Sequence, residues 1–173
     1  LLHWPDDRVP LSETMPALCE LQKQGLTRNI GVSNFNIANI IEAKKYADVP
    51  ISVNQVEFHP FIKQNTLQTF LNNHHILLEA YSPLARGDVF DNEVIKEIAD
   101  KHGITPAQVS LAWILSDKQR IAIPKTSNPE HLQGNLDAVK VTLSADELEK
   151  ISSLARSDGR KIKHPDYSPE WDD

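Results

Sequence analysis

The sequence is poor in the residues that build disulfides and metal centres. Its 173 residues contain a single cysteine, Cys19, so no intrachain disulfide can form, and we expect a reducing, cytoplasmic setting. The seven histidines are scattered without the spacing of metal ligands, and we therefore predict no metal site. No apolar run approaches the roughly 18 residues that a membrane-spanning helix needs, so no membrane contact is expected.

Basic charge and glycine-rich loops are also scarce. A formal net charge of -6 argues against a surface that binds nucleic acid, because such a surface is basic. The six glycines, at positions 25, 31, 87, 103, 134 and 159, never fall two apart, so the G-x-G-x-x-G fingerprint of a Rossmann dinucleotide site is missing. An anionic ligand must therefore be held by a local cluster of residues.

What the chain does contain is a regular alternation of apolar strands and amphipathic helices. We expect strands over residues 1–5, 29–34, 51–57, 76–83 and 121–124. Helical patterns fill the connections, starting near residues 12, 36, 65, 94, 105, 128 and 144. Connections of helical length imply parallel strands and right-handed crossovers. The segment 158–173 shows no periodicity, and we expect it to be irregular.

Several helix starts carry capping residues. Thr105 is followed by Pro106 and Gln108, and Ser144 by Glu147, which are capping-box patterns. Asn128 is expected to cap the helix that opens at Pro129, and Ser12 the first helix of the chain.

Two α/β architectures fit this alternation: an open doubly wound sheet and part of a (β/α)8 TIM barrel. Polar residues stand where four of the expected strands end, at Ser33-Asn34, Gln55 with Glu57, Tyr81-Ser82 and Lys125-Thr126. A barrel builds its site from the carboxyl ends of many strands, whereas an open sheet uses only its switch point. Four contributing strands therefore favour the barrel.

One stretch is the strongest candidate for an anion site. Ile123-Pro124-Lys125-Thr126-Ser127-Asn128 brings a lysine, two hydroxyls and the start of a helix together, which is what a phosphate requires. A capped helix with a surface lysine explains the same residues. Likewise, Tyr81 alone fits core packing as well as a stacking platform, and His3 alone fits a structural histidine at a strand end.

The combination is more specific than its parts. In order, the chain contains Leu2-His3-Trp4-Pro5, Gly31-Val32-Ser33-Asn34-Phe35, Val53-Asn54-Gln55-Val56-Glu57, Ala80-Tyr81-Ser82-Pro83-Leu84 and Ile123-Pro124-Lys125-Thr126. These five motifs resemble the aldo-keto reductases, and the resemblance runs from residue 1 to the Pro169-Glu170-Trp171-Asp172 sequence. Glu79-Ala80-Tyr81 and Glu170-Trp171 resemble in particular small bacterial members such as 2,5-diketogluconate and methylglyoxal reductases.

The resemblance implies a reaction and roles for individual residues. The family transfers a hydride between a nicotinamide cofactor and a small aldehyde or ketone, with a tyrosine as proton donor. His3 matches the histidine that donates a hydrogen bond to the carbonyl oxygen, a contact that is stronger in the transition state than in the ground state. Trp4 matches a residue of the substrate pocket.

Most of the matched residues belong to the family's cofactor site. Ser33, Asn34 and Gln55 match residues that hold the nicotinamide carboxamide, and Tyr81 matches the ring that stacks on it. The remaining matches are Ser82, Pro83 and Leu84 along the pyrophosphate, Ile123, Lys125, Thr126 and Ser127 at the 2′-phosphate, and Asn135 at the adenine.

Two positions depart from the family pattern. His131 stands where many members have an arginine against the adenine and the 2′-phosphate, and Gly134 stands where a glutamate is common. Because a neutral histidine lacks the fixed charge of arginine, we expect weaker selection against NADH. NADPH remains the preferred cofactor because Lys125 is present.

A further departure concerns the extent of the chain. The family's catalytic aspartate, tyrosine and lysine belong to the first three barrel strands, and residue 1 matches the fourth. We therefore expect residues 1–173 to be the carboxyl-terminal portion of one barrel domain, with strands 4 to 8, with the amino-terminal portion absent. Such a chain alone should not reduce carbonyls, whereas the complete protein is expected to be a monomeric enzyme.

Two other functions stay open. The chain could be a non-catalytic module that binds a nucleotide through the phosphate cluster but lacks the proton donor. It could also be part of a phosphate-binding barrel isomerase, although that activity would not need Ser33, Asn34, Gln55 and Tyr81 together.

Overall fold

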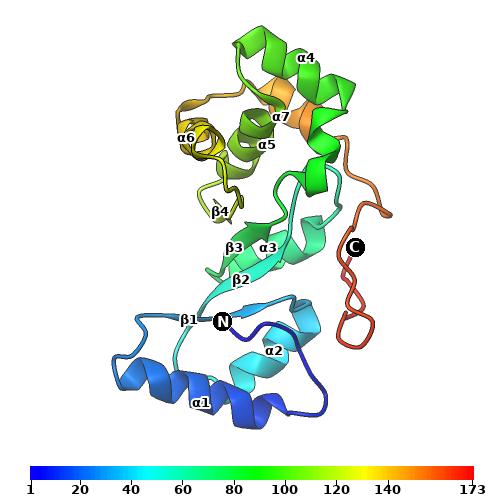
Figure 1. Ribbon diagram of the computed structural model, residues 1–173. Helices are drawn as coiled ribbons and strands as arrows, with labels where there is room; N and C mark the ends of the chain where they lie inside the picture. The colour runs from blue at the N-terminus through cyan, green and yellow to red at the C-terminus, as the bar shows by residue number, and fades with distance from the viewer. The chain divides into compact units, whose positions relative to one another are not determined.

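The computed structural model describes residues 1–173 and divides into two compact units, which Figure 1 shows in ribbon form. The first unit comprises Leu1–Val56, Gln64–Leu78 and Lys163–Asp173. The second comprises Glu57–Lys63 and Glu79–Ile162.

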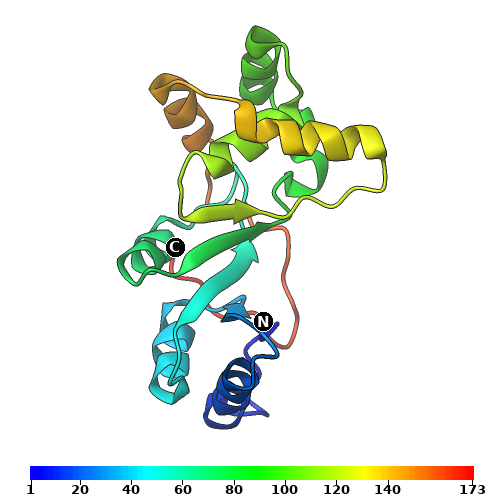
Figure 2. The same ribbon diagram turned by 90° about the vertical axis from the view of Figure 1, so that its left-hand side faces the viewer.

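Four strands follow one another in the sheet in the order of the chain. They are β1 (Ile30–Ser33), β2 (Ile51–Glu57), β3 (Leu77–Tyr81) and β4 (Arg120–Ala122), in the order β1-β2-β3-β4 (Figure 2). β1 pairs with β2 in parallel, from Ile30 opposite Ile51 to Ser33 opposite Gln55. The expected alternation of parallel strands and helical crossovers is therefore present.

The helices of the first unit cover its strands with one apolar face each. They are α1 (Leu11–Lys23), α2 (Ile37–Tyr46) and α3 (Asn65–Asn73). Met15 and Cys19 of α1, Ile40 of α2 and Leu71 of α3 are at most 1% exposed. These side chains recur at helical spacing, which is why the periodicity of the sequence located the helices.

The helices of the second unit gather around a buried one. α5 (Pro106–Leu115) buries every side chain from Val109 to Ile114, and Figure 1 shows it among its neighbours. Those neighbours are the 3-10 helices η1 (Ala85–Phe90) and η2 (Ala138–Lys140) and the α-helices α4 (Glu93–His102), α6 (Pro129–Asp137) and α7 (Ala145–Ser152). No helix in the structure is both long enough and apolar enough to cross a bilayer.

Three of the four expected caps are confirmed. The side chains of Thr105, Asn128 and Ser144 each accept a hydrogen bond from the first turn of their helix. Ser12 is not a cap, because α1 begins one residue earlier at Leu11. Pro10 takes the N-cap position instead, since its φ of -66° and ψ of 147° give the extended geometry that a cap needs.

The expected buried strand over residues 1–5 is reduced to one bridge. Leu2 bonds to β1 through its amide to Gly31 O (3.0 Å) and its carbonyl from Ser33 N (2.7 Å). No strand of the structure pairs with the opposite edge of this segment, so Leu1 is 56% exposed and His3 is exposed as well. The prediction of a strand over residues 1–5 was therefore wrong in its length, although the parallel direction of its pairing is confirmed.

Candidate active site

His3 is held by a buried network of polar side chains in the first unit. Asn34 Nδ2 donates to the His3 carbonyl oxygen (3.0 Å) and to Ser33 Oγ (3.1 Å). Ser33 Oγ in turn donates to the Gln55 carbonyl oxygen (2.9 Å). Ser33 and Asn34 are each 1% exposed, so their bonds are shielded from water. The network fixes the backbone of His3 at the ends of β1 and β2 and leaves its imidazole exposed.

Asn34 also has an unusual backbone. Its φ of 60° lies in the left-handed region, where asparagine is tolerated better than other residues with a side chain. Its amide donates to the Gln55 carbonyl oxygen (2.9 Å), which continues the hydrogen bonding of β1 with β2 beyond the last residue of β1. The turn directs the Asn34 side chain toward His3, so the asparagine acts as a connector between two chain segments.

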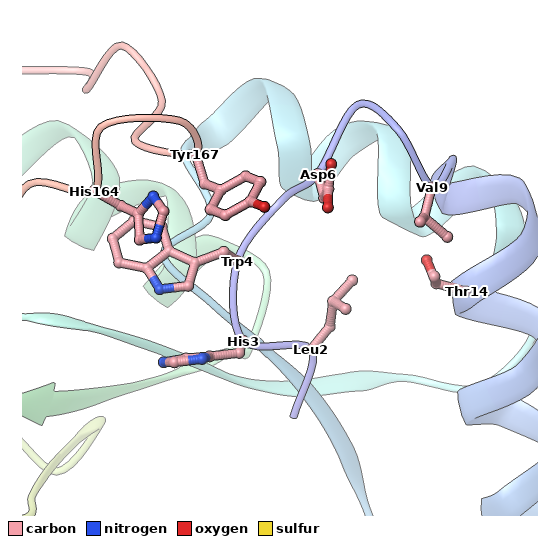
Figure 3. A pocket seen from close by; sticks show the side chains of 8 residues that line it. All are labelled: Leu2, His3, Trp4, Asp6, Val9, Thr14, His164 and Tyr167. Atoms are coloured by element: carbon pink, nitrogen blue, oxygen red, sulfur yellow. The ribbon is translucent and has the colours of Figure 1, made fainter.

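Trp4 lies in a cluster of rings. The centroid of its indole is 6.1 Å from that of His3 and 5.6 Å from that of His164. His164 packs on Tyr167 at 4.3 Å, and Tyr167 hydrogen-bonds to the guanidinium of Arg8. Figure 3 shows His164 and Tyr167 beside the indole, with His3 pointing away from Leu2.

These rings border a pocket of about 450 Å³ in the first unit. Its lining also includes Leu2, Asp6, Val9 and Thr14. Leu2 and His3 are neighbours on an extended segment, so their side chains leave it in different directions, yet both contribute to the lining. The pocket therefore borders residues 2–4, and the rings of Trp4, His164 and Tyr167 form an aromatic wall on one side of it.

In the second unit, Tyr81 ends β3 as expected. Burial, reinforced by the nearby charge of Glu57, raises the pKa of the Tyr81 phenol to about 12, so the hydroxyl is neutral at physiological pH. Half-buried Leu77, Glu79 and Tyr81 alternate with buried Leu78 and Ala80, so Glu79 and Tyr81 lie on the same face of β3. A neutral ring on a strand end can serve as a stacking surface.

Glu57 is a fully buried carboxylate that the sequence reasoning left without a role. It accepts hydrogen bonds from His59 Nε2 (3.0 Å), the Lys161 amide (2.7 Å) and the Ile162 amide (2.8 Å). Burial raises its pKa, but the bonds from His59 and the two amides outweigh burial, and the net shift is downward. Glu57 therefore stays ionised and ties residues 161–162 to the end of β2.

The residues after Tyr81 form a tight turn. Ser82 has a φ of 49°, and Ala85 and Arg86 also lie in the left-handed region. Pro83 is buried, and its carbonyl oxygen accepts a hydrogen bond from Ser110 Oγ (2.7 Å) of α5. Leu84 is half-buried. Ser82, Ala85 and Arg86 are three strained non-glycine positions within one short turn, and proteins retain such backbone at binding sites.

The expected anion cluster is exposed. Lys125 and Ser127 are exposed, and Thr126 is half-buried with its Oγ1 accepting from the Asn128 amide (3.1 Å). The start of α6 contributes less than expected, because Pro129 has no amide proton and the Glu130 amide bonds to Asn128 Oδ1 (2.9 Å). An anion here would therefore be held chiefly by side chains.

Next to this cluster, β4, α5 and α6 enclose a groove of about 540 Å³. Ile123, Lys125 and Asn135 line it together with apolar residues that include Leu132 and Leu136. His131 is exposed on α6 and does not line the groove. Apolar walls, one amide and one ammonium group suit an adenosine with a phosphate attached, so the residues present fit that part of the cofactor.

The structure thus collects the candidate residues in two groups. His3, Trp4, Ser33, Asn34 and Gln55 belong to the first unit, and the residues from Tyr81 to Asn135 to the second. Residues of the segment 158–173 were missed as site residues, because that segment has no periodic pattern. Its aromatic residues were the available signal. No group of three or more histidine, cysteine or acidic side chains could hold a metal ion.

Comparison with known proteins identifies the family of the chain. Residues 1–156 match the model of the Aldo/keto reductase family. Methylglyoxal reductase DkgB of Escherichia coli O157:H7 is 38% identical over 175 residues, which cover 99% of this chain and 65% of that protein. The chain therefore spans less than two thirds of this relative.

Solved structures agree with this relationship. A putative 2,5-diketo-D-gluconic acid reductase B superposes with a TM-score of 0.96 at 35% identity, covering 99% of this chain and 61% of that one. A mutant of Gox0644 in complex with NADPH has a TM-score of 0.87 at 40% identity, covering 93% and 59%. Together with the family match over residues 1–156, these likenesses show that the chain belongs to the aldo/keto reductase family.

Proposed function

We propose that this chain is the carboxyl-terminal portion of an NADPH-dependent enzyme that reduces aldehydes or ketones to alcohols. It would supply strands 4 to 8 and their helices to a (β/α)8 barrel. The observation that carries the proposal is the network of Ser33, Asn34 and Gln55, which fixes His3 beside Trp4 in a chain of this family. The NADPH complex of the Gox0644 mutant supports the choice of cofactor.

Each part of the cofactor would be held by the residues that match the family's cofactor site. Ser33, Asn34 and Gln55 would hold the nicotinamide carboxamide, and Tyr81 would stack on the ring. Ser82, Pro83 and Leu84 would follow the pyrophosphate. The groove with Ile123, Lys125 and Asn135, extended by Thr126, Ser127 and His131, would take the adenosine and its 2′-phosphate.

When bound, NADPH supplies the hydride that reduces the carbonyl carbon. His3 would donate a hydrogen bond from its imidazole to the carbonyl oxygen, where negative charge develops as the hydride arrives. Its exposed ring can reach a ligand, while its backbone is held by Asn34 (3.0 Å). Trp4 would form an apolar wall of the substrate pocket.

The substrate would be a small carbonyl compound. The relative named methylglyoxal reductase suggests methylglyoxal as the first compound to assay. NADH would be accepted less well than NADPH, because His131 provides no fixed charge. We further propose that the complete enzyme is a bacterial, cytoplasmic monomer that binds neither nucleic acid nor membranes.

The test compares the native polypeptide that contains this sequence with its His3→Asn variant. We expect oxidation of NADPH that depends on methylglyoxal, and a fall in kcat of about 100-fold in the variant, because a donor to the developing oxyanion is lost. NADPH affinity should be unchanged by the substitution. Absence of carbonyl-dependent oxidation across a panel of aldehydes and ketones would refute the proposal.

The second candidate is a nucleotide-binding module without catalysis. It is favoured by one observation: of the family's catalytic group, the matched residues in this chain include only His3. NADPH binding by the native polypeptide without turnover of any carbonyl would support this alternative.

A further inference from the structure

Residues 163–173, which we call the strap, cross the first unit without forming a helix or strand of their own. They are nevertheless bound at several points. Asn36 Nδ2 donates to the Glu170 carbonyl oxygen (2.8 Å), and the carboxylates of Asp172 and Asp173 accept from two different helices. Figure 1 shows the strap as the orange to red loop that ends at the label C.

Asp173 supplies a cap that α3 lacks. Gln64 stands at the N-cap of α3, and its side chain makes no capping hydrogen bond. The Asp173 carboxylate instead accepts from the Thr66 amide (2.9 Å) and from Thr66 Oγ1 (2.7 Å). An acidic group at this end of a helix is favoured both by the free amide and by the helix dipole. The start of α3 therefore depends on the strap.

Asp172 makes the corresponding contact with α2. Its carboxylate accepts from the amide of Ile37, the first residue of α2, at 3.2 Å. α2 already has a capping box formed by Asn36 and Asn39, so this helix has two sources of capping. We therefore expect Asp172 to contribute less to its helix than Asp173 contributes to α3.

The other end of the strap forms the aromatic wall of the pocket. His164 packs against Trp4 at 5.6 Å and Tyr167 against His164 at 4.3 Å. Three bonds close this part of the strap into a compact loop: His164 amide to Ser168 Oγ (2.6 Å), Asp166 amide to His164 Nδ1 (3.2 Å) and Ser168 amide to the His164 carbonyl (3.3 Å). These bonds place His164 and Tyr167 on one compact loop, so a displacement of the strap would displace both rings.

We propose that Asp172 and Asp173 are positioning residues, which fasten the strap to α2 and α3 and thereby hold His164 and Tyr167 against Trp4. The role of that wall in substrate binding rests on the function proposed above. The fastening itself does not, because it is defined by contacts within the first unit. Neither aspartate lines the pocket, so both would act on it only through the strap.

Trypsin provides a direct test, because Lys163 marks the start of the strap. We expect cleavage after Lys163 to be about five-fold faster in Asp173→Asn, about two-fold faster in Asp172→Asn, and at least ten-fold faster in the double variant, since caps have effects of this size. The peptide that begins at His164 identifies the cut by mass spectrometry. A double variant that is cut at the wild-type rate would overturn the proposal.

Two variants serve as controls. Glu170→Gln removes a carboxylate from the same strap, but the structure uses only the carbonyl oxygen of this exposed residue, so its cleavage rate should stay at the wild-type level. Asp173→Glu keeps the charge and should restore most of the protection lost in Asp173→Asn. Equal effects of Glu170→Gln and Asp173→Asn would mean that general charge is responsible, which contradicts the proposal.

Fluorine NMR separates opening of the strap from unfolding. With 5-fluorotryptophan, the three tryptophans, Trp4, Trp113 and Trp171, give separate probes. In the double variant the signals of Trp4 and Trp171 should shift, whereas that of Trp113, which is buried in the second unit, should not. Movement of all three signals would indicate unfolding, and an unmoved Trp4 signal would show that the wall does not depend on the aspartates.

Kinetics then tests the link to the proposed reaction. In the native polypeptide that contains this sequence, the double variant should raise the KM for methylglyoxal about five-fold and change kcat less than two-fold, because the wall is displaced while His3 stays fixed. An unchanged KM together with an opened strap would refute a role in substrate binding. If the wild type reduces no carbonyl, the proposed function fails, and the cleavage rates alone decide the fastening.

Discussion

The two units of the molecule hold their candidate site residues in opposite ways. In the first unit, Ser33 and Asn34 are 1% exposed, and their side chains form hydrogen bonds within the protein. In the second, Lys125, Ser127 and His131 are exposed. Buried, mutually bonded groups fix a geometry, whereas exposed charged groups attract a ligand at little cost to the fold.

This contrast separates two kinds of contribution to one function. Substitutions in the buried network should lower stability and activity together. Substitutions in the exposed cluster should change cofactor affinity alone, and that effect should weaken as salt screens the charges. The predictions below test where the contrast holds and where it fails.

Glu57 is an exception to this contrast, because it is a buried, hydrogen-bonded side chain in the second unit. Glu57→Gln keeps the size of the side chain but replaces an acceptor oxygen with an NH2 group that faces backbone amides. We expect a loss of about 3 to 5 kcal/mol in the free energy of unfolding, since one partner of a buried network is removed. Urea denaturation measures the loss. A loss below about 1 kcal/mol would show that residues 161–162 are held by other contacts.

The same residue predicts a pH dependence. Hydrogen bonds hold the pKa of Glu57 below its ordinary value of 4.5, so the unfolded chain takes up the proton first as the pH falls. The stabilisation is complete above that value and is lost as the pH falls through the lower pKa of the folded state. Wild type should therefore lose more stability than Glu57→Gln in acid, and parallel curves for the two proteins would contradict this assignment.

Asn34 tests the buried network in the first unit. Both Asn34→Gly and Asn34→Ala remove two side-chain hydrogen bonds. Glycine adopts the φ of 60° without strain, whereas alanine in this left-handed conformation adds backbone strain. We expect losses in unfolding free energy of about 2 kcal/mol for glycine and about 3 kcal/mol for alanine. Equal stability of the two variants would mean that the backbone conformation contributes nothing.

Lys125 tests the exposed cluster. Lys125→Gln should weaken NADPH binding about ten-fold and leave NADH binding unchanged, because only the 2′-phosphate requires the charge. The unfolding free energy should stay at the wild-type value, since the side chain is exposed. Titration calorimetry at low and high salt measures the affinity for both cofactors. An equal loss of affinity for NADH would mean that Lys125 contacts a part of the nucleotide other than the 2′-phosphate.

His131 should give the smallest effect. His131→Arg restores a permanent charge on α6 and should improve the preference for NADPH over NADH about three-fold, which is the size of an exposed ion pair. His131→Gln serves as the neutral control and should leave the preference at the wild-type value. An equal preference for NADPH over NADH in the arginine and glutamine variants would show that residue 131 does not contact the cofactor.

Local patterns in the sequence were sufficient to locate most elements of the fold. The spacing of apolar residues and the capping residues predicted the helices α4, α5, α6 and α7. Gly103 ends α4, and Thr105, Asn128 and Ser144 cap the starts of the helices that follow them directly in the sequence. Strand ends that carry Ser33, Asn34 and Tyr81 were also predicted, since apolar runs that stop at polar residues mark the edge of a sheet.

Contacts between distant segments were not predictable in the same way. Glu57 meets residues 161–162, and Asp173 meets Thr66, across more than 100 positions. Nothing in a single sequence records such a pairing. The expected strand at residues 1–5 became a single bridge for a related reason: an apolar pattern shows that a segment can pair, whereas pairing itself needs a neighbour on each side.

The central claim is that His3 belongs to a site for hydride transfer from NADPH, and isotope transfer tests it most directly. The native polypeptide that contains this sequence would be incubated with methylglyoxal and NADPH that carries deuterium at both C4 positions of the nicotinamide. The account predicts that the alcohol carries one deuterium on the former carbonyl carbon and that His3→Asn slows its formation about 100-fold. An alcohol without deuterium, or no alcohol at all, would contradict it.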